Sequence, residues 1–317
     1  MAKQTTPKFS VVVPVYNSQD SLEPLFHRLE KVFAELNSSW QLILINDCSK
    51  DNSWQVIEKL VSKHSQITGI NLLNNFGQPN AIMCGLSHAQ GQYVITMDDD
   101  LQHPPEEISK LYHALTTKNY SVVYGQYEDA KNRKRGFIRD FASLSLHKLI
   151  SKVTSSGYTA TSYRIMTSQV VAQIVLSRQY YVFVDVLIKD AVHSSYIGTC
   201  KIEHHQRTIG TSNYSYKKLV TYALNMIFNY TTWPLRLATI LGFIFSTISF
   251  CAAVFFILYY FIAGISVSGW TSLMLSVTFL SGVVLFVLGI IGEYLGRIFM
   301  GISNKPQFVI KEIKNKK

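Results

Sequence analysis

The sequence predicts an α/β fold, with a mostly parallel sheet covered by helices on both faces, followed by a pair of membrane-spanning helices. Two observations carry this prediction. In the first part of the 317-residue chain, short apolar runs alternate with amphipathic stretches, as in strand–helix units of a parallel sheet. Further on, no Asp, Glu, Lys or Arg occurs between Arg236 and Glu293, a gap long enough for two helices of about 20 residues and a turn.

The elements of the sheet domain follow from the hydrophobic period. Four apolar runs predict strands, at Phe9–Val13, Gln41–Ile45, Tyr93–Met97 and Ser121–Tyr124. Four stretches with helical spacing of apolar residues predict helices, at Leu22–Leu36, Trp54–Lys63, Pro79–Ala89 and Glu106–Leu115. Polar clusters follow three of the strands directly, at Pro14–Asn17, Asn46–Asp47 and Asp98–Asp100. Because parallel sheets bind ligands at the carboxyl ends of their strands, we expect a ligand site where these clusters meet.

The charge-free gap predicts two spans, Leu237–Gly264 and Trp270–Gly292. Basic residues flank the pair on both outer sides, and the loop between the spans is uncharged. The positive-inside rule then makes the chain a multi-pass protein of the inner (plasma) membrane, with the sheet domain and both termini cytoplasmic. The alternative is a helical hairpin buried in a soluble core.

The segment Tyr214–Tyr230 is amphipathic, which suits either an interfacial helix or a helix packed on the sheet domain. The expected divisions are the sheet domain at 1–212, an amphipathic interfacial region at 213–234, two transmembrane helices at 235–298 and a basic cytoplasmic tail at 299–317.

The net charge of +10 is compatible with nucleic acid, or with anionic lipid and phosphate-bearing substrates. The basic residues form no DNA-reading motif such as paired Cys and His ligands or a basic zipper. With two expected spans, the membrane and a phosphate-bearing substrate are the favoured partners, and nucleic acid is not expected.

Three consecutive acids, Asp98–Asp100, end an apolar strand and precede Gln102. Like charges so close repel each other unless a cation joins them, and Mg²⁺ or Mn²⁺ prefers carboxylate oxygens and substrate phosphates. On an extended stretch Asp98 and Asp100 point the same way. The alternative is a solvated acidic turn at a helix start, which the following prolines and glutamates also suit.

These segments together resemble the family 2 glycosyltransferases that act on polyprenyl phosphates, such as dolichyl-phosphate mannose synthase, the bactoprenol glucosyltransferases and the aminoarabinose transferase. The segments that carry the resemblance are Val13–Asn17, Asn46–Asp51, Asn75–Gln78, Asp98–Pro105, Arg207–Tyr214, Pro234–Arg236 and Ile291–Arg297. The resemblance implies a GT-A catalytic domain with a Rossmann-like sheet, a two-helix membrane anchor and a divalent metal, Mg²⁺ or Mn²⁺.

The resemblance also implies roles for individual residues. Catalytic roles fall to Asp98, Asp100 and Arg207, and the metal ligands would be Asp98, Asp100 and Gln102. Nucleotide-sugar binding falls to Pro14, Tyr16, Asn17, Asp47, Asp98 and Asp99, with Pro14 and Tyr16 lining the base pocket and Asp47 bonded to the base. Acceptor phosphate binding falls to Arg133, Arg139, Arg164, Arg207 and Ser212. The alternatives are a strand-ending turn at Pro14–Asn17, a helix cap at Asp47 and Asp51, and a basic helix resting on anionic membrane at Arg133 and Arg139.

The chain departs from the family pattern at three positions. Ser18 replaces a common Glu, Ser162 replaces an acid often discussed as a catalytic base, and Asn213 replaces the Lys of mannose synthases. A polyprenyl phosphate is largely ionised near neutral pH, since phosphate second pKa values lie near ~6. It therefore needs no general base, and we expect a single in-line displacement with inversion.

The expected function is thus transfer of a sugar from a nucleotide-sugar donor to a polyprenyl phosphate, for lipopolysaccharide, O-antigen or other cell-envelope glycan modification. The expected acceptor is undecaprenyl phosphate. A homo-oligomer is compatible with this function. The main alternative is a non-catalytic membrane scaffold of a sugar-modification complex. A processive polysaccharide synthase would carry an Arg-Trp pair that this sequence lacks, and a transporter would need charges inside its spans.

Overall fold

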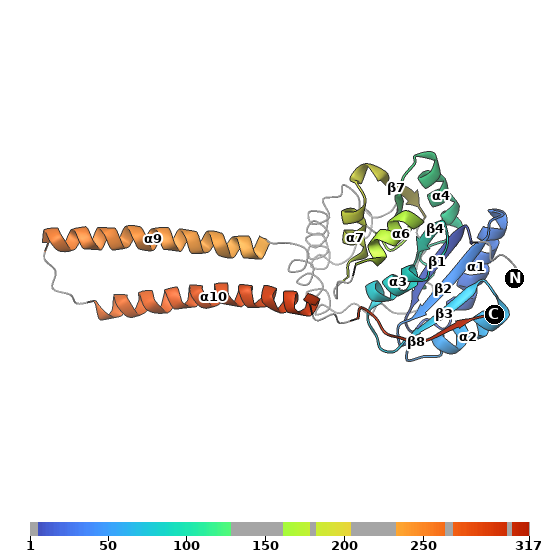
Figure 1. Cartoon of the computed structure of the whole chain (residues 1–317), viewed down its shortest axis with the longest axis horizontal. Helices are drawn as coiled ribbons and strands as arrows, with labels where there is room; N and C mark the ends of the chain where they lie inside the picture. The colour runs from blue at the N-terminus through green and yellow to red at the C-terminus, as the bar shows by residue number, and fades with distance from the viewer. Residues whose placement is uncertain are drawn as a thin grey trace. The chain divides into compact units, whose positions relative to one another are not determined.

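The computed structural model describes residues 6–127, 161–177, 182–203, 233–263, 269–302 and 306–316 (Figure 1). The chain divides into two compact units, one made of Met1–Asn213 with Pro306–Lys317 and the other of Tyr214–Lys305. The first unit holds the sheet and the second holds the two long helices.

The first unit is built on an eight-stranded mixed sheet with the order β7-β5-β6-β4-β1-β2-β3-β8. The strands are β1 (Phe9–Val15), β2 (Trp40–Asn46), β3 (Ile67–Leu72), β4 (Tyr93–Thr96), β5 (Val122–Tyr127), β6 (Arg164–Thr167), β7 (Ile197–Ile202) and β8 (Ile310–Asn315). Strands β4, β1, β2 and β3 run parallel to one another, whereas β6 is antiparallel to β4 and β5, and β8 is antiparallel to β3. The carboxyl ends of the four central strands therefore meet at one edge of the sheet.

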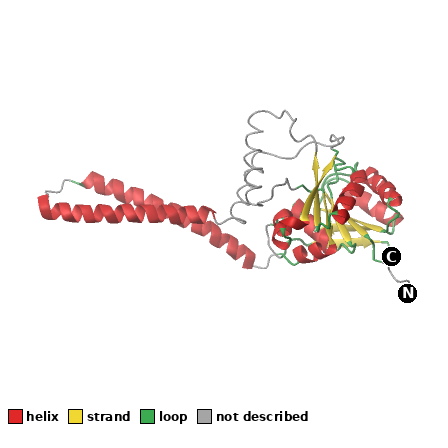
Figure 2. Ribbon diagram, turned by 90° about the horizontal axis from the view of Figure 1, so that it is seen from above, coloured by secondary structure: helices red, strands yellow, loops and turns green. Residues whose placement is uncertain are grey.

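Helices cover both faces of this sheet (Figure 2). They are α1 (Leu22–Glu35), α2 (Ser53–Lys63), α3 (Gln78–Ser87), α4 (Ile108–Thr117), α6 (Ser168–Val175) and α7 (Val184–Ala191), with short 3-10 turns η1 (Pro105–Glu107) and η2 (Ser194–Tyr196). Alternate residues of β1 face opposite cores: Val11 and Val13 pack with α1, α2 and α4, whereas Val12 packs with α3, α6 and α7. Burial on both faces explains why the strands read as continuous apolar runs.

The predicted α/β fold with a mostly parallel sheet is confirmed. The C-terminal segment differs from the expected tail at 299–317, because helix α10 continues to Ile302 and β8 pairs with β3 in the sheet. Lysines that alternate with other residues are typical of an edge strand that is protected from further pairing. The same lysines led to the prediction of a basic cytoplasmic tail.

The second unit consists of α9 (Trp233–Ala263) and α10 (Trp270–Ile302). Their apolar side chains are mostly exposed, and the rings of Phe245 and Phe279 lie 5.4 Å apart, edge to face. Among the described residues, one stretch is long and apolar enough to cross a membrane, Phe279–Phe299, and none of it is buried; Pro234–Phe245 is a shorter apolar stretch. The two-span anchor therefore remains a prediction.

Candidate active site

Three loops at the carboxyl edge of the sheet carry residues in the left-handed backbone region. Asn17 follows β1 with φ 55°, Cys48 follows β2 with φ 56°, and Leu101 follows β4 with φ 60°. For residues with a Cβ this conformation costs about 1–3 kcal/mol each. Because β4, β1 and β2 are neighbours, the three strained residues lie at the edge of the sheet where the sequence predicts the ligand site.

The loops after β1 and β2 are tied to each other by reciprocal hydrogen bonds. The backbone N–H of Asn17 donates to Ser49 Oγ (3.1 Å), and the N–H of Lys50 donates to Asn17 Oδ1 (2.8 Å). Asp51 accepts from the N–H of Gln19 (3.2 Å) and from the N–H of Ser53 (3.0 Å) at the start of α2. Asp51 thus braces the β1 loop against the start of α2, and part of this role is the helix cap expected from the sequence.

Asp47 connects the end of β2 to the loop before α3. Its side chain is buried, and its two oxygens accept from the N–H groups of Phe76 (2.7 Å) and Gly77 (2.9 Å). Burial raises the pKa of Asp47, and these two hydrogen bonds act in the opposite direction. Gly77 has φ +84° and ψ 153°, a conformation essentially restricted to glycine. Asp47 therefore helps to hold this turn in place, and its contact with a nucleotide base stays a prediction.

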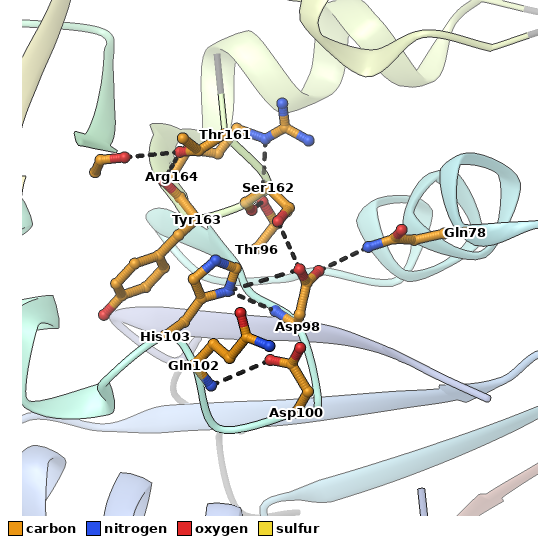
Figure 3. Close-up of polar contacts among 11 residues, drawn as sticks. Gln78, Thr96, Asp98, Asp100, Gln102, His103, Thr161, Ser162, Tyr163 and Arg164 are labelled. Carbon is orange, nitrogen blue, oxygen red and sulfur yellow. Dashed lines mark hydrogen bonds and ion pairs between the residues drawn. The ribbon is translucent and has the colours of Figure 1, made fainter. Parts of the chain in front are cut away.

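Asp98 lies at the centre of the hydrogen bonds drawn in Figure 3. Its carboxylate accepts from Ser162 Oγ (2.8 Å) and from Gln78 Nε2 (2.7 Å). Its backbone N–H donates to Nδ1 of the buried His103 (3.1 Å). The segment before β6 and helix α3 thus fix the orientation of this carboxylate, and the loop after β4 holds the Asp98 backbone.

Asp99 points to the β1 loop instead, as expected for alternate side chains of an extended stretch. Its Oδ2 accepts from the N–H of Tyr16 (3.3 Å). Burial raises the pKa of Asp99, and the negative charges on either side also raise it. The hydrogen bonds from Ser18 and Tyr16 lower it, and the net result is a pKa of about 7. The Tyr16 side chain itself is exposed and so can stack on a flat ligand.

Asp100 and Gln102 belong to the tight turn around Leu101. The N–H of Gln102 donates to Asp100 Oδ1 at 3.1 Å, which closes the turn. Asp98, Asp100 and Gln102 supply only oxygen donors, which suits a hard cation such as Mg²⁺. The described residues contain no cluster of three His, Cys, Asp or Glu side chains that could hold a metal alone. The donor set therefore fits an ion that takes one or two carboxylates from the protein and the remaining oxygens from a substrate diphosphate.

Arg164, a predicted phosphate ligand, is buried and paired within the protein. Its side chain is 2% exposed and forms an ion pair with Asp185 of α7. Its Nε donates to Thr96 Oγ1 (3.0 Å), and the Thr96 hydroxyl donates to the carbonyl of Ser162 (2.6 Å). Tyr124 also donates to Asp185 (3.1 Å). This arrangement favours a supporting role for Arg164 beneath Ser162 and Asp98 over a direct phosphate contact.

Gln78, Thr96, His103 and Asp185 were not predicted to be site residues. A buried arginine needs an acidic partner, but no local pattern marks Asp185 as that partner. Of the other predicted residues, Pro14 is the penultimate residue of β1. Four more, Arg133, Arg139, Arg207 and Ser212, lie outside the described residues and stay predictions.

Comparison with known proteins finds a glycosyltransferase family and relatives that match nearly the whole chain. The profile of glycosyl transferase family 2 matches residues 10–170. An uncharacterized glycosyltransferase of Synechocystis sp. is 32% identical over 97% of this chain and 96% of its own length. The undecaprenyl-phosphate 4-deoxy-4-formamido-L-arabinose transferase of Proteus mirabilis is 31% identical over 96% of this chain and 94% of its own length.

Among solved structures, the glucosyl-3-phosphoglycerate synthase of Mycobacterium tuberculosis, crystallised with Mn²⁺, UDP-glucose and phosphoglyceric acid, has a TM-score of 0.52. It is 15% identical, over 70% of this chain and 78% of that one. At that identity the likeness concerns the fold alone.

Proposed function

We propose that this chain, which belongs to glycosyl transferase family 2, transfers a sugar from a nucleotide-sugar donor to a polyprenyl phosphate at the cytoplasmic face of a membrane. The observation that carries the proposal is its similarity, over nearly its whole length, to a transferase named for undecaprenyl phosphate. A relative that shares only the catalytic domain would support the sugar transfer but not the lipid acceptor. The similarity here includes the two long apolar helices.

The donor half of the proposal rests on the strand-end loops. The exposed ring of Tyr16 suits stacking on a base, and the interlocked loops at Asn17 and Ser49 form a rigid border beside it. Asp98, Asp100 and Gln102 would hold a divalent cation, Mg²⁺ or Mn²⁺. When bound, such a cation neutralises the charge of the leaving diphosphate. The structural relative crystallised with Mn²⁺ and UDP-glucose makes UDP-sugars the first donors to test.

The acceptor half of the proposal agrees with the chemistry around Ser162. Where many relatives carry an acid, this chain has a hydroxyl that donates to Asp98, so Ser162 supplies no general base. A phosphate monoester with a second pKa near ~6 is already an anionic nucleophile at neutral pH. Its oxygen attacks the anomeric carbon, the bond from that carbon to the donor phosphate breaks, and the nucleoside diphosphate leaves with the electron pair. This single displacement inverts the anomeric configuration.

The strand β8 supports the proposed pair of membrane crossings. Helix α9 follows the strands of the sheet along the chain, and β8, which follows α10, hydrogen bonds to β3 of the same sheet. One folded unit lies on a single side of a bilayer, so the chain between β7 and β8 crosses an even number of times. Two crossings suit two apolar helices of 31 and 33 residues, each longer than the about 20 residues that a span needs.

The experiment that tests this function uses the purified full-length protein with Mg²⁺, undecaprenyl phosphate and a panel of nucleotide sugars. Mass spectrometry of the lipid fraction should find one glycosyl phospholipid that depends on both substrates. No lipid product from any donor, with transfer to a water-soluble acceptor instead, would contradict the proposed acceptor. Retained anomeric configuration would contradict the single displacement, and full activity in excess EDTA would contradict the metal.

A non-catalytic membrane scaffold is the second function to consider. It would tolerate loss of the acidic loop, whereas here Asp98 is held by three separate segments of the chain. A carboxylate whose position is fixed by several contacts favours an enzyme over a scaffold.

A further inference from the structure

The last strand of the chain contributes a polar side chain to a row that crosses the sheet. In the registers of β2 with β3 and of β3 with β8, Asn46 lies opposite Asn71, and Asn71 lies opposite Glu312. The three side chains are joined by hydrogen bonds: Asn46 Nδ2 donates to Asn71 Oδ1 (2.9 Å), and Asn71 Nδ2 donates to Glu312 Oε1 (3.2 Å). They form one ladder, which we call the amide ladder.

The amide ladder is buried at one end and open at the other. Asn46 and Asn71 are 3% and 7% exposed, whereas the Glu312 side chain is 33% exposed. Buried amides are costly unless their polar atoms are paired. A carboxylate can only accept hydrogen bonds, so Glu312 forces the Asn71 amide to present its NH₂ group to β8 and its oxygen to β2. The same constraint then passes to Asn46, whose oxygen must face away from β3.

That oxygen holds the loop after β2. Asn46 Oδ1 accepts from the N–H of Ser49 (3.3 Å), and Ser49 Oγ accepts from the N–H of Asn17 in the loop after β1 (3.1 Å). Both loops contain a residue in the strained left-handed region, Asn17 and Cys48. Strained loops keep their shape only when surrounding contacts hold it. The amide ladder supplies some of these contacts.

We propose that Glu312 is a positioning residue for the nucleotide half of the donor site, acting through Asn71 and Asn46 on the loops after β2 and β1. This inference rests on the proposed function, because it takes those loops to bind the nucleotide. Strand β8, which follows the apolar helices, would then set the orientation of the Asn71 amide behind the donor site. The acceptor lipid phosphate is not part of this chain of contacts.

The test measures binding of nucleoside diphosphates to the full-length protein by isothermal titration calorimetry, with UDP, GDP, CDP and dTDP as the probes. Glu312→Ala removes the acceptor of the Asn71 NH₂ group and should weaken binding of the nucleotide that the wild type prefers by about 5- to 10-fold, the net effect of one ordinary intramolecular hydrogen bond. Glu312→Gln keeps an acceptor oxygen and should stay within about 3-fold of the wild type.

A matched control comes from the same strand. Lys314 contacts both Glu58 (3.3 Å) and Glu312 (3.7 Å), so Glu58→Ala also removes one carboxylate from Lys314 but leaves the amide ladder intact. This variant should bind nucleotide like the wild type. A merely structural effect of Glu312→Ala would lower the binding stoichiometry and the melting temperature but not the affinity of the remaining folded protein.

The possible results distinguish failure of the positioning role of Glu312 from failure of the proposed function. Equal nucleotide affinity in Glu312→Ala and wild type overturns the inference and leaves the proposed function standing. Equal weakening in Glu312→Ala and Glu58→Ala also overturns it, because the loss would then come from β8 in general. No binding of any of the four nucleotides to the wild type overturns the proposed function and the inference together. In the transfer assay, the KM for the donor should rise in Glu312→Ala, while the KM for undecaprenyl phosphate stays constant.

Discussion

Replacing Asp185 with asparagine tests whether Arg164 supports the site from beneath or binds substrate phosphate. The change keeps the side-chain volume and an acceptor oxygen but removes the charge that pairs with the buried Arg164 guanidinium. Removing one partner of a fully buried ion pair costs about 3–5 kcal/mol. The Asp185 side chain is 35% exposed, so water takes over part of its role and we expect a loss of about 2–3 kcal/mol.

For a domain of this size each kcal/mol lowers the melting temperature by about 2–4 °C, so the Asp185→Asn variant should melt roughly 4–12 °C lower. Circular dichroism of the detergent-solubilised protein measures this shift. Asp190→Asn, an exposed position on the same helix, should melt like the wild type. An unchanged melting temperature together with a raised KM for undecaprenyl phosphate would refute the supporting role and return Arg164 to phosphate binding.

Three further predictions concern the loops of the site. The pKa of Asp99 is about 7 in the fold against 3.8 for the free side chain, so the folded state holds a proton that the unfolded state lacks, and wild-type stability falls as pH rises through this window. In EDTA, the Asp99→Asn variant should therefore gain stability over wild type as the pH rises from about 4 to 7. The gain should reach about 4 kcal/mol, at about 1.4 kcal/mol for each pH unit, and stay constant above pH ~8. A gain that grows on acidification would contradict the assignment. Gly77→Ala places a Cβ on a glycine-only conformation and should cost about 1–3 kcal/mol of unfolding free energy, seen as a lower melting temperature; no loss would mean that the turn has a different shape. Ser162→Ala removes one hydrogen bond to Asp98 and should lower kcat by about 5-fold, whereas a complete loss of activity would give the hydroxyl a direct part in the chemistry.

Local patterns were enough to predict much of the sheet domain. The runs at β1, β2 and β4 are mostly apolar because both faces of these strands are buried. The helices between them show the period of one buried face. The polar residues directly after those strands marked the edge of the sheet where the strained loops gather. These features depend on neighbours in sequence, so a single sequence carries them.

The features that escaped prediction depend on residues far apart in sequence. Glu312 meets Asn71 across 241 positions, and nothing within β8 indicates which strand it will join. In the same way, Arg164 reads as an exposed phosphate ligand until Asp185 is known to lie beside it. Asp47 reads as a base ligand, but its carboxylate also accepts two backbone N–H groups from the loop before α3, a contact that only the folded chain reveals.

The central claim is that the acidic loop after β4 catalyses transfer to a polyprenyl phosphate, and release of nucleoside diphosphate tests it most directly. With the donor identified from the panel, a coupled assay should detect release that begins on addition of undecaprenyl phosphate and is abolished by Asp100→Asn in a protein of unchanged melting temperature. Release at the same rate without the lipid phosphate, or at the wild-type rate in the folded Asp100→Asn variant, would contradict the account.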